Sequence, residues 1–236
     1  MLLWLIYDRE HIPRNQFFID RWLEAGREKG LSVQVVPREE LTWGIRDNRL
    51  YLTAANQRGL PYCVVMRAMD PLLSSHLEGM GIPVFNNAGI SRICNDKRLT
   101  HQFVSGLWPM MDTAFLGPGQ IDSPFPYPVV IKSARGNGGR QVFLAEDEDA
   151  FRLALEQIAP DEALVQPLCD TPGRDVRVYM LGDKVVKAMM RVSLSDFRSN
   201  VGLGAEAFPW DPGEKPLALA RQLAHRLDAG LIGVDF

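Results

Sequence analysis

Residues 132–142 read Lys-Ser-Ala-Arg-Gly-Asn-Gly-Gly-Arg-Gln-Val and follow the apolar run Val-Val-Ile. The pattern predicts a strand over residues 128–133, a flexible glycine loop, and a second strand over residues 140–145. Glycines allow consecutive backbone N–H groups to face one concavity, which suits phosphate oxygens, and Lys132 adds a positive charge. A glycine-rich hairpin without a ligand fits the same residues.

Two better-known phosphate-binding motifs are excluded. A P-loop requires a Gly-Lys-Ser/Thr sequence after the loop, and none follows here. A dinucleotide-binding fingerprint would need a third glycine at the position of Gln141 and a helix after the loop, whereas a strand is expected there. A Rossmann-type enzyme built on the first strand is also disfavoured. Residues 8–13, Asp-Arg-Glu-His-Ile-Pro, contain no glycine-rich turn.

On the N-terminal side of this loop, strand and helix patterns alternate. Phe18, Trp22 and Ala25 share one helical face, and Gly30 is placed to end that helix. The strands expected here cover residues 2–7, 31–36, 62–66 and 82–85, and the helices cover residues 15–29 and 71–80. Residues 42–56 fit a hairpin or a loop. This alternation predicts a small parallel α/β sheet.

The pattern changes after about residue 87. The expected helices cover residues 90–104, 147–158 and 215–228, and further strands cover residues 113–116, 163–166, 174–181, 184–192 and 231–236. Gly182-Asp183 is a two-residue hairpin signal between two of these strands. We therefore expect an α+β region that begins near residues 86–89.

Several polar residues outside the glycine loop are candidates for nucleotide binding. Lys97 follows Asn-Asp, although a lysine on a polar helix is usually a solvated surface group. The segment Gln166, Pro167 and Leu168 ends a strand and offers backbone groups to an adenine edge. Asp175 could accept from ribose hydroxyls, and a loop with a strand-start carboxylate fits the same residues equally well.

The C-terminal candidates are two arginines, an asparagine and an aspartate. Arg191, Arg198 and Asn200 lie close together in sequence, and the arginine fork matches carboxylate and phosphate groups. For each residue taken alone, a strand with outward charges and an exposed loop is the slightly favoured interpretation. Asp235 lies within the apolar Gly-Val-Asp-Phe end, where a carboxylate needs a partner or a metal ion.

The order of these motifs is more specific than any one of them. Asn-Asp-Lys, the strand lysine, the glycine loop, Gln-Pro-Leu, Gly-Arg-Asp-Val-Arg, Ala-Met-Met-Arg, Asp-Phe-Arg-Ser-Asn and Gly-Val-Asp follow one another. In this order, residues 86–236 resemble the ATP-grasp superfamily, and most closely its RimK-type branch of amino-acid and glutamate ligases. The N-terminal part is similar only in general pattern to the small domain that precedes the family's ATP-grasp domain.

The resemblance implies a fold and a domain arrangement. We expect an α/β N-terminal domain with a small parallel sheet over residues 1–88, followed by an α+β ATP-grasp domain over residues 89–236. A lid subdomain is expected at about residues 101–165. In this chain, the C-terminal strand of the ATP-grasp domain is expected to be truncated.

The resemblance also assigns roles to residues. Lys97 and Lys132 correspond to lysines that contact nucleotide phosphates, and the hinge for adenine corresponds to Gln166, Pro167 and Leu168. Asp175 matches the residue near the ribose. The mobile loop over the triphosphate would contain Gly136, Asn137, Gly138 and Gly139. Arg191 corresponds to an arginine near the terminal phosphate, and Arg198 and Asn200 match residues beside the reacting carboxyl and phosphoryl groups. Asp235 corresponds to the first of three metal ligands.

Two departures from the family pattern follow. The hinge usually has a glutamate where Pro167 stands, and proline has no N–H to donate. The other two metal ligands, a Glu and an Asn on the next strand, would lie beyond Phe236. An intact enzyme is therefore expected to continue by several tens of residues.

The implied activity is an ATP-dependent carboxylate–amine ligase that forms an amide bond through an acyl phosphate and releases ADP and phosphate. ATP and Mg²⁺ or Mn²⁺ are the expected cofactors, and small carboxylates and amines, such as amino acids or peptides, are the expected substrates. The alternative is a catalytically impaired ATP-binding module of the same fold.

The composition narrows the class of protein. The 236 residues include 26 Lys+Arg and 29 Asp+Glu, for a net charge of −3, and 46% are hydrophobic. This balance argues against wholesale disorder and against a nucleic acid or an anionic membrane as the main partner. The 3 cysteines form no Cys-x-x-Cys motif, and the apolar start is too short for a signal peptide, so we expect a cytoplasmic protein.

Overall fold

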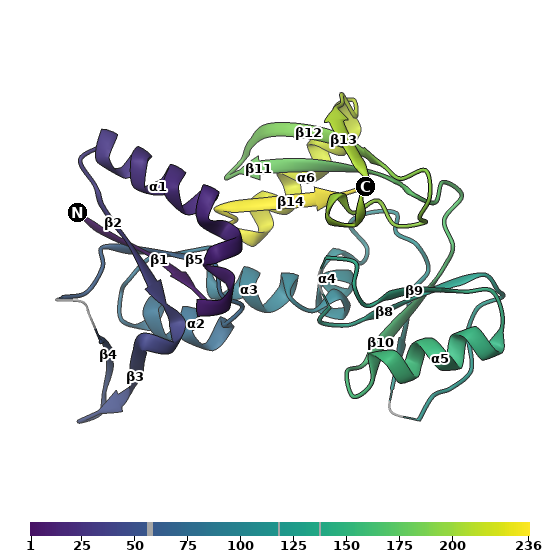
Figure 1. Ribbon diagram of the computed structural model, residues 1–236, viewed down its shortest axis with the longest axis horizontal. Helices are drawn as coiled ribbons and strands as arrows, with labels where there is room; N and C mark the ends of the chain where they lie inside the picture. The colour runs from purple at the N-terminus through teal and green to yellow at the C-terminus, as the bar shows by residue number, and fades with distance from the viewer. Residues whose placement is uncertain (56–58, 118, 137) are drawn as a thin grey trace. The chain divides into compact units, whose positions relative to one another are not determined.

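The computed structural model describes residues 1–55, 59–117, 119–136 and 138–236. The chain divides into two compact units (Figure 1). Unit 1 contains Met1–Arg92 with Leu227–Leu231, and unit 2 contains Ile93–Arg226 with Ile232–Phe236. The expected domain boundary at residue 88 and the extent of the lid stay predictions.

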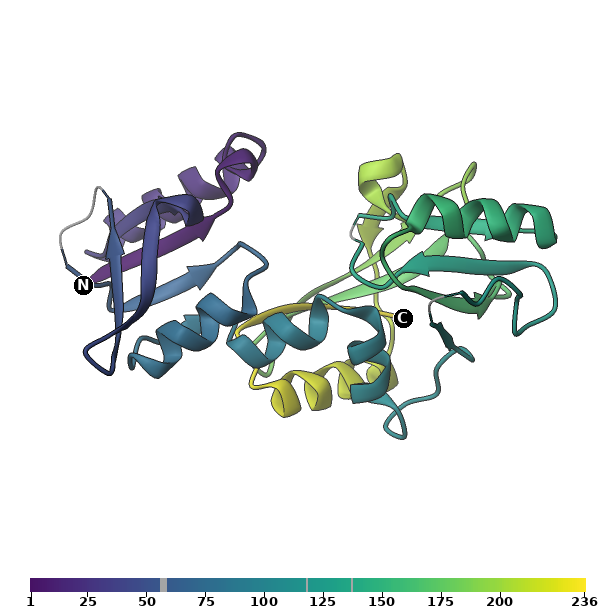
Figure 2. The same ribbon diagram turned by 90° about the horizontal axis from the view of Figure 1, so that it is seen from below.

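Unit 1 is built on a parallel sheet of four strands in the order β2-β1-β5-β6. The strands are β1 (Leu2–Tyr7), β2 (Ser32–Pro37), β5 (Cys63–Met66) and β6 (Val84–Phe85). Figure 2 shows α1 (Gln16–Glu28) on one face of this sheet and α2 (Pro71–Gly79) on the other. The predicted small parallel sheet is confirmed.

Both faces of β1 are buried, as expected for a central parallel strand. One face packs with Ile19 of α1, whereas the other packs with α2 residues such as Leu73. The alternation along the strand assigns Leu3, Leu5 and Tyr7 to the α1 side and Trp4 and Ile6 to the α2 side.

The ambiguous segment after β2 forms a hairpin in its described part. Strand β3 (Leu41–Arg46) pairs with β4 (Arg49–Ala54) through a two-residue turn at Asp47 and Asn48. Both turn residues have positive φ, +50° and +57°, which the favoured type I′ hairpin turn requires.

Unit 2 contains two sheets, and the first has α5 (Glu148–Ile158) packed on it. Its order is β7-β10-β8-β9, with antiparallel pairs throughout. The core beneath the helix includes Phe151 and Ile158 against Val129 and Ile131. These strands are β7 (Ala114–Leu116), β8 (Val129–Ser133), β9 (Val142–Ala145) and β10 (Ala163–Pro167).

The second sheet of unit 2 has the order β13-β12-β11-β14. Strands β11 (Arg174–Leu181) and β12 (Lys184–Val192) form the predicted hairpin, with Gly182 in the turn. The remaining elements are β13 (Glu206–Pro209), which the sequence did not predict, α6 (Glu214–Leu227) and β14 (Leu231–Asp235). Short 3₁₀ helices cover Arg9–His11, Pro13–Asn15, Arg38–Glu40 and Val201–Leu203.

One predicted helix is divided in the structure. In place of a continuous helix over residues 90–104, α3 (Ala88–Cys94) ends before Asn95-Asp96 and α4 (Lys97–Val104) begins after it. Asp96 has an extended backbone, and its carboxylate accepts from the Arg98 N–H at 2.9 Å. This N-cap hydrogen bond stabilises a new helix start, so Lys97 becomes its first residue.

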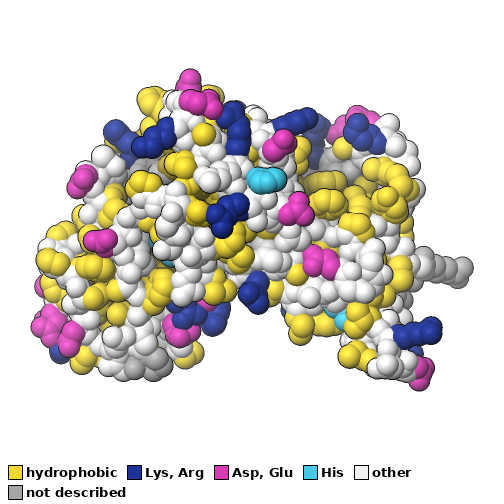
Figure 3. All heavy atoms as spheres, turned by 180° about the vertical axis from the view of Figure 1, so that it is seen from behind, with side chains coloured by type: hydrophobic (Ala, Val, Ile, Leu, Met, Phe, Trp, Pro, Cys, Tyr) yellow, Lys and Arg dark blue, Asp and Glu magenta, His cyan; other side chains and the backbone are white. Residues whose placement is uncertain are grey.

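The surface shows charges of both signs. On the face in Figure 3, Lys and Arg side chains are interspersed with Asp and Glu side chains rather than gathered by sign. Within the described ranges, none of the helices is both long enough and apolar enough to cross a bilayer.

Candidate active site

Unit 2 contains a cavity of about 520 Å³ between its two sheets. Residues of α4, β8, the glycine loop, β10, β11, β12, segment 197–200 and the end of β14 line it. The site residues predicted from the sequence that line this cavity are Lys97, Lys132, Gly136, Gly138, Gly139, Gln166, Pro167, Leu168, Asp175, Arg191, Arg198, Asn200 and Asp235. Asn137 lies outside the described residues. Their individual roles stay predictions.

Two lysine ammonium groups approach this cavity from different elements. Lys97 Nζ, at the start of α4, donates to the Ser133 carbonyl at 2.8 Å and to the Gly136 carbonyl. Lys132 Nζ, on β8, donates to Gln166 Oε1 at 2.6 Å. Among the described residues, no carboxylate oxygen lies within ion-pair distance of either Nζ. Both cations therefore rest on neutral acceptors.

The surroundings of these lysines disfavour their charged forms. Burial lowers the pKa of Lys97, and the nearby Lys132 charge lowers this pKa further, while Asp161 and Asp96 oppose the shift only in part. Burial also lowers the pKa of Lys132. An anion in the cavity would relieve both effects, because an opposite charge stabilises an ammonium group.

Gln166 holds Lys132 in place. Its side chain is 6% exposed, and its amide nitrogen donates to Thr113 Oγ1 at 2.8 Å while its oxygen accepts from Lys132. The neighbouring backbone is also occupied, because the Leu168 N–H donates to the Pro128 carbonyl at 3.2 Å and Pro167 has no N–H. The Gln166 side chain therefore positions a cation as well as lining the cavity.

The glycine loop contacts the Asp-Phe-Arg-Ser-Asn segment. Arg198 donates to the Gly139 carbonyl at 2.9 Å, and Asp196 holds the same guanidinium at 2.6 Å. Gly139 has φ +76°, and a Cβ there would lie 2.6 Å from Asn200 Oδ1. The absence of a side chain at Gly139 is thus required for this close approach.

A second glycine joins two motifs of the site. Gly173 has φ +76°, and a Cβ there would lie 2.8 Å from the Ser193 carbonyl oxygen and 2.7 Å from that of Asp196. Its N–H donates to the Phe197 carbonyl at 2.7 Å. The Gly-Arg-Asp-Val-Arg motif therefore packs directly against the segment that carries Arg198.

Arginine–aspartate pairs occupy the opposite wall of the cavity. Arg191 is 6% exposed, and its Nε donates to Asp175 Oδ1 at 2.6 Å, across the β11–β12 register. Arg177 donates to both oxygens of Asp235 at 2.6 Å, and Arg191 lies 3.3 Å from the same carboxylate. Both carboxylates therefore already accept from guanidinium groups.

This donor set does not by itself make up a magnesium site. Asp235 is the predicted ligand, yet arginines neutralise its charge, and Mg²⁺ prefers free oxygen ligands in octahedral geometry. In the part of the chain that the structure describes, no three His, Cys, Asp or Glu side chains gather as metal ligands. The role of Asp235 and the Mg²⁺ or Mn²⁺ cofactor stay predictions.

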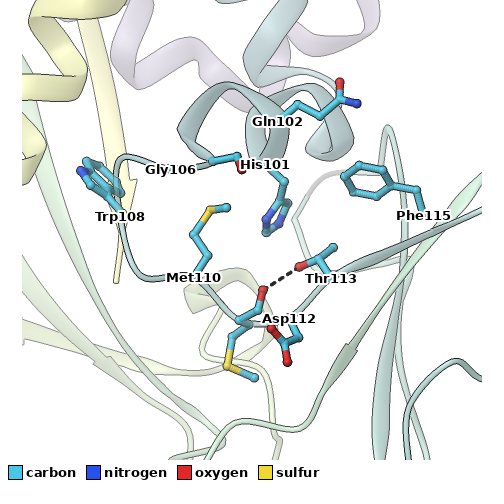
Figure 4. A pocket seen from close by; sticks show the side chains of 10 residues that line it. His101, Gln102, Gly106, Trp108, Met110, Asp112, Thr113 and Phe115 are labelled. Atoms are coloured by element: carbon cyan, nitrogen blue, oxygen red, sulfur yellow. Dashed lines mark hydrogen bonds between the residues drawn. The ribbon is translucent and has the colours of Figure 1, made fainter.

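A second hollow of about 500 Å³ borders this cavity and shares His101 and Met111 with it. Figure 4 shows the His101 ring reaching from α4 towards Thr113, with Trp108 on the opposite side. Burial and the Lys132 charge lower the pKa of His101, and its Nδ1 is buried without a hydrogen-bond partner among the described residues. The imidazole is therefore neutral near pH 7.

Several residues of the cavity were not predicted from the sequence. Arg177 had a usable signal, because it lies two positions from Asp175 on one strand and so faces the same side. His101 had none, since one histidine on a polar helix predicts no contact. Cys94 and Cys169 also line the cavity and had no motif.

A family model for the RimK-like ATP-grasp domain matches residues 118–236. The chain belongs to the RimK-like ATP-grasp family. A relative is the human beta-citrylglutamate synthase B, which is 31% identical over 260 residues, 99% of this chain and 66% of that protein. The chain thus spans slightly less than two thirds of this relative's length.

Solved structures share the fold over the whole chain. The RimK domain protein of Sphaerobacter thermophilus has a TM-score of 0.70 at 25% identity and covers 100% of this chain and 85% of its own. The ATP complex of the D-alanine–D-alanine ligase from Bacillus anthracis has a TM-score of 0.69 at 14% identity, with coverages of 100% and 81%. The predicted family and the predicted fold class are confirmed.

Proposed function

We propose that the cavity of unit 2 binds ATP and that the protein is an ATP-dependent ligase joining a small carboxylate to an amine. One observation carries this proposal: Lys97 and Lys132 approach one cavity beside a glycine loop, and within the described ranges neither has a carboxylate partner. A polyphosphate supplies the missing negative charge. The names of the ATP-grasp relatives support the same reaction class.

The proposed reaction has two steps. A carboxylate oxygen attacks the γ-phosphorus of ATP, and ADP leaves, which gives an acyl phosphate. The amine nitrogen then attacks the acyl carbon, phosphate leaves with the electron pair of the broken C–O bond, and the nitrogen loses its proton. The products are an amide, ADP and phosphate.

The residues of the chain would act mainly by binding and by neutralising charge. Carboxylate and triphosphate repel each other, so positively charged groups placed where charge accumulates lower the barrier. Lys97 and Lys132 would contact the phosphates, and the loop that contains Gly138 and Gly139 would cover them. Arg198, held by Asp196, would face the transferred phosphoryl group, and exclusion of water would protect the acyl phosphate.

Other residues would hold the nucleoside. The hinge at Pro167 and Leu168 lines the same cavity and would contact the adenine, and Asp175 would lie near the ribose. We also propose small carboxylates and amines as the substrates. Arg191 would lie near the terminal phosphate, and Asn200 would lie beside the reacting groups. A cytoplasmic location belongs to the same proposal.

A second candidate function is an ATP-binding module that does not catalyse transfer. The ion pairs of Asp235 with Arg177 and Arg191 favour it, because a carboxylate held by two arginines is a poor metal ligand. ATP affinity separates the two candidates. Binding that is insensitive to Mg²⁺ and yields no ADP would favour the module.

The decisive experiment measures ATP binding and ADP release for matched lysine and arginine variants. We expect Lys132→Ala and Arg198→Ala each to lower ADP release by on the order of 10²-fold, the effect of removing one charge-stabilising donor. Lys187→Ala, an exposed lysine on β12, is the control and leaves ADP release unchanged. Unchanged turnover in both site variants would overturn the ligase proposal.

A further inference from the structure

Unit 1 has a second place where its fold favours ligand binding. In the order β2-β1-β5-β6, α1 leads from β1 to one neighbouring strand, and α2 leads from β5 to the strand on the other side. The two connections leave in opposite directions, so the carboxyl ends of β1 and β5 form a topological switch point. Ligands of open α/β sheets bind in the crevice at such points.

The residues at this point include an arginine in a fixed position. Arg67 directly follows β5, and its backbone N–H donates to the Ile6 carbonyl at 2.8 Å. Its guanidinium carbon lies 5.1 Å from the Phe18 ring centroid and 6.0 Å from that of Tyr7. Stacking on aromatic faces leaves the N–H groups at the guanidinium edge free to donate.

Arg67 has no acidic partner, unlike the charged groups around it. Arg38 binds Asp8 at 2.8 Å and Asp70 at 3.3 Å, and Arg9 binds Glu40 at 2.7 Å. For Arg67, no carboxylate oxygen of the described residues lies within ion-pair distance. This exposed arginine therefore keeps its full capacity to bind an oxyanion.

A buried hydroxyl supports the same interpretation. Tyr7 is 1% exposed, and its hydroxyl has no hydrogen-bond partner among the residues that the structure describes. A buried polar group without a partner is costly, and a functional site is one reason to retain it. The centroid of this tyrosine ring lies 6.0 Å from the Arg67 guanidinium carbon, so both side chains belong to the same end of the sheet.

We propose that the carboxyl ends of β1 and β5 bind a substrate carboxylate, with Arg67 as its ion-pair partner and the Tyr7 hydroxyl as a second donor. That this carboxylate belongs to a substrate rests on the proposed ligase function. A carboxylate fits better than a phosphate, because one arginine neutralises one charge and the acidic side chains of Asp8, Glu39 and Asp70 lie along the same edge.

The test uses the full chain without nucleotide and glutarate as the probe. Calorimetry measures its affinity, and glutaramide, the neutral diamide of the same shape, is the matched ligand. We expect Arg67→Gln to weaken glutarate binding by at least about tenfold, as the loss of charge-assisted hydrogen bonds does. Tyr7→Phe should weaken it several-fold, whereas Arg14→Gln, an exposed arginine of the same unit, should leave it unchanged.

Each outcome decides a separate point. The carboxylate site would be overturned if Arg67→Gln binds glutarate as tightly as the wild type does. It would also be overturned if the wild type binds glutaramide as tightly as glutarate, or binds inorganic phosphate more tightly than glutarate. Thermal unfolding of each variant checks that unit 1 remains folded. If glutarate binding depends on Arg67 but ATP is neither bound nor hydrolysed, the site stands and the ligase proposal fails.

Discussion

At the scale of single residues, the candidate active site retains charges that burial disfavours. Lys132 is half-buried and donates to a neutral amide oxygen rather than to a carboxylate. An ammonium group in such a place loses hydration without gaining a counterion, so it lowers the stability of the folded protein. Groups of this kind are retained where a bound anion compensates for them.

We therefore predict opposite effects of Lys132→Met on stability and on binding. The variant should raise the free energy of unfolding near pH 7 by on the order of 1 kcal/mol, as removal of unfavourable site residues commonly does, and it should weaken ATP binding. Chemical denaturation and calorimetry measure the two effects. Lys187→Met, on the exposed surface, is the control and should change stability by less than about 0.5 kcal/mol.

The pH dependence of this effect has a definite sign. Because the pKa of Lys132 is lowered in the folded protein, the unfolded chain binds more protons between that lowered value and the ordinary value of 10.5. The wild-type free energy of unfolding therefore rises with pH across this window. The advantage of Lys132→Met should shrink there, and a variant that is less stable than the wild type at pH 7 would contradict the argument.

Motifs with a local signature made most of the site predictable at this scale. Lys132 and the glycines stand in one stretch, and their phosphate chemistry can be argued from residue type alone. The pairing of Arg177 with Asp235 joins positions 58 apart in sequence. Such a contact depends on which strands become neighbours, and one sequence contains no local pattern for it.

At the scale of elements, close packing of the glycine loop depends on backbone conformation. Gly138 and Gly139 both have positive φ, +64° and +76°, so alanine is strained at either position. A Cβ at Gly138 would meet nothing within 4 Å, whereas at Gly139 it would lie 2.6 Å from Asn200 Oδ1. Alanine variants at the two positions therefore separate the effect of backbone strain from the effect of displacing Asn200.

We predict that Gly139→Ala weakens ATP binding about tenfold more than Gly138→Ala does. The difference reflects the forced movement of Asn200 and Arg198, since overpacking costs about 1–3 kcal/mol and about 1.4 kcal/mol corresponds to a tenfold change. Calorimetric titration with ATP measures both variants. Equal losses would mean that backbone strain alone matters and that the loop does not act through Asn200.

The elements were predictable where patterning was strong and less so where a single side chain decides. The alternation of strand and helix patterns predicted the parallel strands of unit 1, and two strand patterns joined by Gly182-Asp183 predicted the β11–β12 hairpin. The break between α3 and α4 depends on the Asp96 hydrogen bond to the Arg98 N–H, and a polar segment shows no periodicity that would reveal it. Strand β13 pairs with the edge of β12 and is exposed on all four residues, so its sequence lacked an alternating pattern.

At the scale of the whole molecule, the two units have separate hydrophobic cores. The cores of unit 1 contain residues such as Trp4, Leu5 and Leu73, and a core of unit 2 contains Ile131 and Phe151. A ligand that binds only the folded form of one unit stabilises that unit by mass action. Local stability can therefore report which unit a ligand binds.

We predict that ATP slows amide hydrogen exchange in β8 and β10 of unit 2 and leaves β1 of unit 1 unchanged. At a concentration of 100 times the dissociation constant, the stabilisation is about 2.7 kcal/mol, which corresponds to roughly 100-fold slower exchange of amides that open only on unfolding. Glutarate should produce the reverse pattern, with protection in β1 and β5.

Exchange measured by mass spectrometry in Lys132→Ala and Arg67→Gln completes this test. Lys132→Ala should lose the protection by ATP and keep the protection by glutarate, because it lacks only the cation that contacts ATP. Arg67→Gln should lose the protection by glutarate and keep the protection by ATP, because it lacks only the cation that contacts glutarate. If ATP slows exchange in β1 as much as in β8, the two units unfold as one cooperative body. If ATP protects β1 alone, the nucleotide binds unit 1 and the cavity between the sheets of unit 2 is not its site.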